Sequence, residues 1–122
     1  SMKSQAYRMT MLFDFYGDVL TDRQKEFYDL YYNEDLSLGE IAENYGITRQ
    51  GVRDVIVRAE AVLTDLEDNT GLIKRFHTMR TQLEQLRNDA QRITELAAHQ
   101  DNSELERLAR QVRDGAEALL KE

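Results

Sequence analysis

Residues 36–63, LSLGEIAENYGITRQGVRDVIVRAEAVL, decide the fold. Ser37 can cap a helix start, and Glu40 stands three residues later, as a capping box requires. Apolar residues then recur at helical spacing as far as Tyr45. Gly46 follows at the position where a helix end favours a residue that tolerates a positive φ. The stretch therefore predicts a short helix that ends in a glycine turn.

A second, longer helix is predicted after this turn. Thr48 can cap it, and its apolar positions keep the helical period: Val52, Val55, Ile56, Ala59, Val62, Leu63 and Leu66. A short helix, a tight turn and a longer helix make a helix-turn-helix, whose second helix offers its N-terminal side chains to the major groove of DNA. The candidate nucleic-acid-binding residues are Thr48, Arg49, Gln50, Arg53 and Arg58.

These residue types suit contacts with DNA, but their neighbours do not all do so. Arg49 and Arg53 are four residues apart and can reach guanine edges, and Gln50 can reach adenine. The helix N-terminus can hold a phosphate. Asp54 places a negative charge near the same groove, and Arg58 can pair with it or with Glu60 instead. Helix-turn-helix folds also serve as protein docking modules, so both alternatives stay open.

The motif also resembles known sequences. The segments EIAE (40–43), GITR (46–49), VR (52–53) and RA (58–59) resemble region four of bacterial sigma factors, which reads promoter DNA. Residues 7–120 resemble the YlxM/p13-like family of small bacterial proteins, most specifically in TMLFDFYGDVLTDRQKEFYDLYYNEDLSLGEIA (10–42). Gly51 and Asp54 depart from the sigma pattern, where long polar or basic side chains are usual. The resemblance implies a link to the signal recognition particle pathway, with its RNA or GTPase as possible partners.

The charge distribution is unfavourable for DNA binding. Residues 1–71 carry seven basic and fourteen acidic side chains, whereas residues 72–122 carry nine of each. The half with the helix-turn-helix therefore holds the whole net charge of −7. Because phosphate contacts need a basic face, this half must gather its few arginines or bind something other than DNA.

The rest of the chain predicts an all-α protein. Helices are expected at 6–16, at 21–32 and from Thr48 to Asp68, with a turn at 69–71. Thr21 can cap the second of these, with Gln24 at the capping-box position. Apolar residues then follow a heptad seam: Leu72, Phe76, Met79, Leu83, Leu86, Ala90, Ile93 and Ala97. After a loop at 98–102, Ser103 is expected to cap a last helix with Glu106. We predict a sigma-region-four-like helix-turn-helix domain (1–68) followed by an antiparallel helical hairpin (72–122).

The hairpin has too narrow an apolar seam to be stable alone. We therefore predict a symmetric homodimer, in which the hairpin meets its mate or the mate's first domain. The alternative is an intramolecular bundle in a monomer.

Two further surface features have a plain and a functional interpretation. The aromatic residues of the first domain are expected in the core, but Tyr28 and Tyr32 are candidates for an exposed patch that binds a partner. The basic residues Lys74, Arg75, Arg80, Arg87 and Arg92 form either an ordinary solvated helix surface or a face that binds RNA. The plain interpretation is favoured in both cases.

The sequence gives no sign of catalysis. There is no cysteine and no phosphate-binding loop, dinucleotide fingerprint or HExxH motif. Glu95 and His99 have possible ligand spacing, but without a second cluster we expect no metal site, no cofactor and no enzyme activity. No apolar run has the length of a membrane span and no signal peptide is visible, so a cytoplasmic protein without membrane insertion is expected.

Two hypotheses remain. The first is a regulatory protein that binds nucleic acid through the helix-turn-helix. The second is an acidic adaptor that docks on a basic protein, such as the GTPase of the signal recognition particle, without binding DNA.

Overall fold

The computed structural model describes residues 5–121, which form six α-helices and one short 3-10 turn, with no strand among them. In chain order the elements are α1 (Ala6–Tyr16), η2 (Gly17–Val19), α2 (Asp22–Tyr32), α3 (Leu38–Tyr45), α4 (Arg49–Thr70), α5 (Leu72–His99) and α6 (Ser103–Leu120). The described residues fall into two compact units, one ending at Ile73 and the other beginning at Lys74. The all-α class is confirmed.

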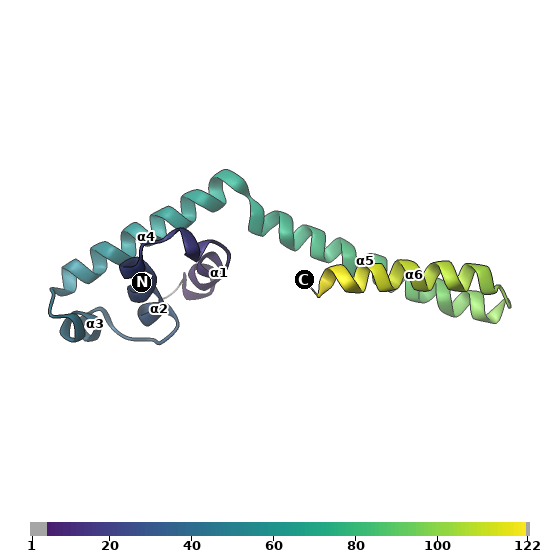
Figure 1. Cartoon of the computed structure of the whole chain (residues 1–122), viewed down its shortest axis with the longest axis horizontal. Coiled ribbons are helices and arrows are strands. Elements are labelled where there is room, and N and C mark those ends of the chain that lie inside the picture. The colour runs from purple at the N-terminus through teal and green to yellow at the C-terminus, as the bar shows by residue number, and fades with distance from the viewer. Residues whose placement is uncertain (1–4, 122) are drawn as a thin grey trace. The chain divides into compact units, whose positions relative to one another are not determined.

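The first unit is organised around α4. Helices α1, α2 and α3 all pack against it, as Figure 1 shows. One core cluster joins the N-terminal half of α4 to α2 and α3: Phe27, Tyr31, Leu38, Ile41, Ala42, Val52 and Ile56. A second cluster joins its C-terminal half to α1 and α2: Met9, Leu12, Tyr16, Leu20, Tyr28, Ala59, Leu63 and Ile73. The helical period of α4 thus supplies both clusters from one face.

The aromatic side chains lie mostly in these clusters. Tyr28 is fully buried, its hydroxyl donates to the Met9 carbonyl at 2.6 Å, and its ring stacks on Phe13 at 5.1 Å. Tyr32 is half-buried, and its hydroxyl donates to Glu60 at 2.7 Å. The alternative of an exposed patch on Tyr28 and Tyr32 was wrong, because both hydroxyls find partners inside the unit.

The helix α4 ends later than the sequence predicted. It runs through the expected turn at residues 69–71 as far as Thr70, where the Thr70 hydroxyl donates to the Leu66 carbonyl at 2.8 Å. Gly71 alone makes the break, in the left-handed region at φ 60°. The Tyr16 hydroxyl donates to Glu67 at 2.6 Å, and Glu67 also accepts from the backbone of Ile73 at 3.0 Å. These bonds fix the first turn of α5.

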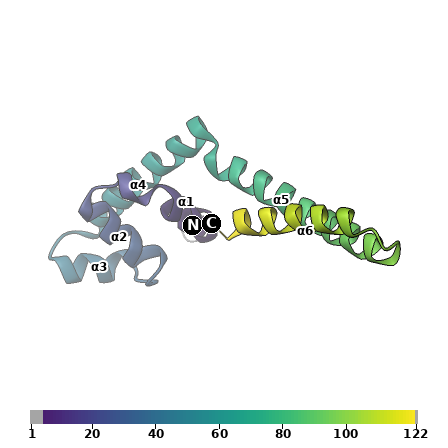
Figure 2. The same cartoon turned by 45° about the vertical axis from the view of Figure 1, so that its right-hand side comes forward.

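The second unit is a hairpin of α5 and α6, which run side by side in both views (Figures 1 and 2). The loop is shorter than predicted, since α5 continues to His99. The cap is Asn102, whose Oδ1 accepts from the Leu105 backbone at 3.0 Å. The prediction of a Ser103–Glu106 capping box was wrong by one residue, because Ser103 is already the first residue of the helix. Glu106 pairs with Arg110.

The residues of the predicted heptad seam in α5 differ in burial within the chain. Ala90 and Ala97 are buried, whereas Leu86 is 50% and Ile93 41% exposed. The small members of the seam pack against the hairpin partner, and its large members lie beside that contact.

Candidate nucleic-acid interface

The N-terminus of α4 is held by local structure that the sequence encodes. Ser37 and Glu40 form a reciprocal capping box at the start of α3. Gly46 then adopts φ 66°, which lets the Ile47 amide donate to the Ala42 carbonyl at 3.1 Å. Thr48 caps α4 by accepting from the Gly51 amide at 2.9 Å. All the predicted caps of the helix-turn-helix are therefore present.

Gly51 lies close to the cap of α4. A Cβ at this position would lie 3.2 Å from the Thr48 hydroxyl oxygen and 3.8 Å from the Ile47 side chain. The first of these contacts is tighter than ordinary van der Waals packing. Glu40 occupies the same position relative to the Ser37 cap, so a cap of this kind does not by itself require a glycine.

The three basic residues of α4 are available to a ligand. Arg49, Arg53 and Arg58 are all exposed. Within residues 5–121, no hydrogen bond or ion pair joins their side chains to another group, so the expected pairing of Arg58 with Asp54 or Glu60 does not form. The face of α4 that carries Val52 and Ile56 is buried. At about 100° per residue, Arg49 and Arg53 project within about 40° of each other, whereas Arg58 projects beyond Asp54 to another side of the helix.

The arginines of the hairpin differ from those of α4. Arg80, Arg92, Arg107, Arg110 and Arg113 all form ion pairs with carboxylates of their own unit. At about 100° per residue, Lys74 and Arg92 project to one side of α5 and Arg80 and Arg87 to another. The second basic set therefore does not make one continuous face, which favours the plain interpretation.

Gln50 and Asp54 occupy the middle of the exposed face. The Gln50 amide donates to the Asp54 carboxylate at 2.9 Å, and both residues are exposed. This bond holds the Gln50 side chain against Asp54 and uses one of the two hydrogens of its amide nitrogen. Asp54 keeps a negative charge between the positions of Arg53 and Arg58, so the positive face is interrupted.

A tyrosine that sequence reasoning did not single out ties α3 to α2. The ring of Tyr45 packs edge-on against Phe27, with 5.0 Å between centroids. A hydrogen bond from the Tyr45 hydroxyl to Glu26 raises the pKa of Tyr45, and its partial burial adds to the effect. This contact fixes the C-terminal end of α3, directly before the turn that leads to Thr48.

The other predicted features do not assemble into a site. Over residues 5–121, no group of three or more His, Asp or Glu side chains could hold a metal ion, and Glu95 pairs with Arg92. None of the helices in that range is long and apolar enough to cross a membrane.

Comparisons with known proteins agree with the helix-turn-helix. Residues 3–104 match a family model described as "Putative helix-turn-helix protein, YlxM / p13 like". A protein of Desulforamulus reducens is 53% identical over 70 residues, which are 57% of this chain and 60% of that protein. A Thermoanaerobacter relative is 45% identical over 87 residues, 71% of this chain and 74% of its own.

A more extensive match is to a protein of Bacillus mycoides, 41% identical over 97 residues, which are 77% of this chain and 88% of that protein. These relatives carry the name UPF0122 protein, which states no activity. No solved structure matches the chain.

Proposed function

The chain belongs to the YlxM/p13-like family of helix-turn-helix proteins, and from this we propose that it is a non-catalytic regulatory protein that binds nucleic acid through α4. The observation that carries the proposal is the state of Arg49, Arg53 and Arg58. They are exposed on a capped helix and have no partner among the described residues, whereas five arginines of the hairpin are already paired. Unpaired guanidinium groups can bind phosphates and release counterions from DNA.

The acidic background limits this affinity. The net charge of −7 lies in residues 1–71, and Asp54 stands within the proposed face. Phosphate contacts must therefore overcome repulsion by the same unit. We expect binding to be weak at physiological salt and to strengthen steeply as the salt concentration falls.

The experiment is a titration of the protein into a fluorescent DNA duplex of mixed sequence at low salt, with fluorescence anisotropy as the measure of binding. We expect micromolar binding by the wild-type protein and loss of binding in Arg49→Ala with Arg53→Ala. The double variant Arg107→Ala with Arg110→Ala is the matched control, because it removes the same two charges from exposed arginines that are already paired. Retained affinity in the folded Arg49 and Arg53 variant would overturn the proposal.

The second candidate is the acidic adaptor, which two observations favour. The Gln50–Asp54 bond occupies the side chain that is best suited to adenine, and the unit that contains it is strongly acidic. Such a surface suits a basic protein rather than a phosphate backbone. If the duplex does not bind at low salt, this candidate takes precedence.

We further propose, from the family resemblance, that the protein acts in the cytoplasm and in the signal recognition particle pathway. The RNA and the GTPase of the particle are then the ligands to test. Binding to the RNA that depends on Arg49 and Arg53 would support the first candidate. Binding to the GTPase that those substitutions do not change would support the adaptor.

A further inference from the structure

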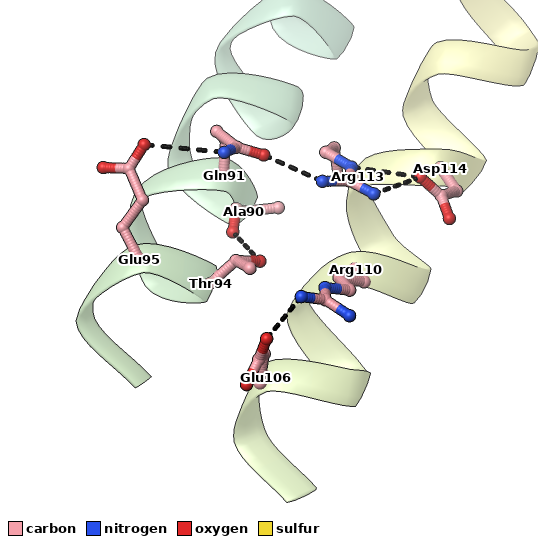
Figure 3. A network of polar contacts seen from close by, with 8 residues as sticks. All are labelled: Ala90, Gln91, Thr94, Glu95, Glu106, Arg110, Arg113 and Asp114. Atoms are coloured by element: carbon pink, nitrogen blue, oxygen red, sulfur yellow. Dashed lines mark hydrogen bonds and ion pairs between the residues drawn. The ribbon is translucent and has the colours of Figure 1, made fainter. Parts of the chain in front are cut away.

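The two helices of the hairpin meet through small side chains. The residues buried between them are Ala90, Thr94, Ala97, Ala109 and Ala116. Thr94 satisfies its hydroxyl within α5 by donating to the Ala90 carbonyl at 2.9 Å (Figure 3). Alanines let two helices approach closely, but they bury little apolar area. The contact between α5 and α6 therefore uses only a small part of the apolar surface of these helices.

One edge of this contact is closed by polar groups. Arg113 of α6 donates to the Gln91 side chain of α5 at 2.9 Å, as Figure 3 shows. Arg80 of α5 donates to the Leu120 carbonyl of α6 at 2.9 Å. These bonds across the hairpin give it a hydrophilic edge.

The other edge is open and apolar. Leu86 and Ile93 of α5 lie across a groove from Leu105, Leu108 and Val112 of α6. Asp89 also lines this groove, and its carboxylate accepts a hydrogen bond from Gln85 at 2.9 Å. Their exposed fractions run from 39% for Leu105 to 53% for Val112. The other large apolar residues of the unit that are exposed to a similar degree are Met79, Leu96 and Leu119. An apolar stripe of this size on the surface of a helical hairpin indicates an interaction surface.

We propose that a second copy of this chain covers the groove, so that two hairpins form an antiparallel four-helix bundle. The interface would be isologous: Leu86 and Ile93 of each copy face the apolar residues of the other across a two-fold axis. Helices with large residues on one side and close contacts on the other suit the packing of such a bundle.

Two features of the hairpin favour a second copy over another partner. Eight half-exposed apolar side chains present on the order of 600 Å² per copy, near the roughly 800 Å² that each partner contributes to a stable interface. Residues 72–122 carry nine basic and nine acidic side chains, so two hairpins meet without net repulsion. The first unit, with a net charge of −7, could not pair with itself as easily.

The stripe also spans two helices, and an equally wide face is needed to cover it. A copy of the same hairpin supplies two helices with the same apolar face. A single helix would fill the groove but would leave the outer residues of the stripe, such as Leu96 and Leu119, in water.

The test is the mass of the intact chain in solution, by multi-angle light scattering over a wide concentration range. We expect twice the chain mass of 14.3 kDa. Val112→Glu and Leu108→Glu should each reduce the measured mass to that of one chain. Helicity should not change, because both side chains are exposed on the hairpin of a single copy. Val62→Glu is the matched control: this valine is exposed on α4, outside the hairpin, and the variant should remain a dimer.

Three results would overturn the proposal. A wild-type mass of one chain at every concentration would mean that no second copy binds. A dimer that survives both hairpin substitutions would place the interface elsewhere. Dissociation of the Val62→Glu variant would show that the interface is not confined to the hairpin. This inference does not depend on nucleic-acid binding, so either proposal can fail without the other.

Discussion

At the residue scale, Tyr28 shows how burial makes stability depend on pH. Its hydroxyl is buried against the Met9 carbonyl, and burial, with a smaller effect of Glu60, raises the pKa of Tyr28. A raised pKa means that the unfolded chain loses this proton before the folded chain does. The contribution of the protonated Tyr28 hydroxyl to the free energy of unfolding is complete below the ordinary tyrosine pKa of about 10 and is lost as pH rises above it.

We therefore predict that the Tyr28→Phe variant loses less stability than the wild type as pH rises into the alkaline range. The substitution should cost about 1 kcal/mol near neutral pH through the lost hydrogen bond. Between about pH 8 and pH 11, urea unfolding should show a smaller fall in the unfolding free energy for the variant than for the wild type. Equal falls in the two proteins would show that Tyr28 does not carry the effect. Some loss should remain, because burial also raises the pKa of Tyr32.

Asp54 distinguishes the two candidate functions by the sign of one change. Asp54→Asn removes the negative charge from the α4 face and leaves an oxygen that can still accept from Gln50. If α4 binds phosphates, duplex affinity should rise roughly threefold to tenfold, which corresponds to about 1 kcal/mol, the interaction of two charges about 4 Å apart in water. If the unit docks on a basic protein, affinity for that partner should fall instead. Anisotropy at fixed salt measures the change.

Residues that act locally were predictable from the sequence. The caps at Thr21, Ser37 and Thr48 depend on neighbours three residues away, and Gly46 on its own freedom of φ. The Gln50–Asp54 bond was not predicted. Both side chains can adopt other rotamers in solvent, so the spacing alone does not select the pair.

At the element scale, the cap of α6 gives a direct comparison of sequence and structure. We predict that Asn102→Ala costs about 1 kcal/mol, because it leaves the Leu105 amide without its acceptor. Ser103→Ala should be nearly neutral, since Ser103 is the first residue inside the helix. Urea unfolding followed by far-ultraviolet circular dichroism measures both. A larger loss of stability for Ser103→Ala than for Asn102→Ala would instead support Ser103 as the cap, as the sequence predicted.

The period of the helices was predictable, but the side of α5 that meets α6 was not. A heptad seam shows which residues gather on one side, and Ala90 and Ile93 both belong to it. Helix α6 packs against the alanines of α5 because small side chains allow the two helices to approach closely. The hydrogen bond from Arg113 to Gln91 lies at the adjoining edge of this contact. These contacts exist only once both helices are placed.

At the scale of the whole molecule, charge and apolar surface divide between the units. The acidic first unit carries three unpaired arginines on α4, and the neutral hairpin carries an apolar groove. Counting the acidic and basic residues of the sequence was enough to show that the net charge lies in the first unit. The identity of the partners was not predictable, because an exposed arginine and an exposed leucine each suit more than one class of ligand.

The most direct measurement is the slope of log affinity against log salt concentration for duplex DNA. Each phosphate contact contributes about −0.9 to this slope, so three arginines predict roughly −3 per chain, and loss of Arg49 and Arg53 should leave about −1. The Arg107 and Arg110 control should keep the wild-type slope. Equal slopes for the wild type and the Arg49 and Arg53 variant, or no binding at low salt, would contradict the assignment of α4 as a nucleic-acid interface.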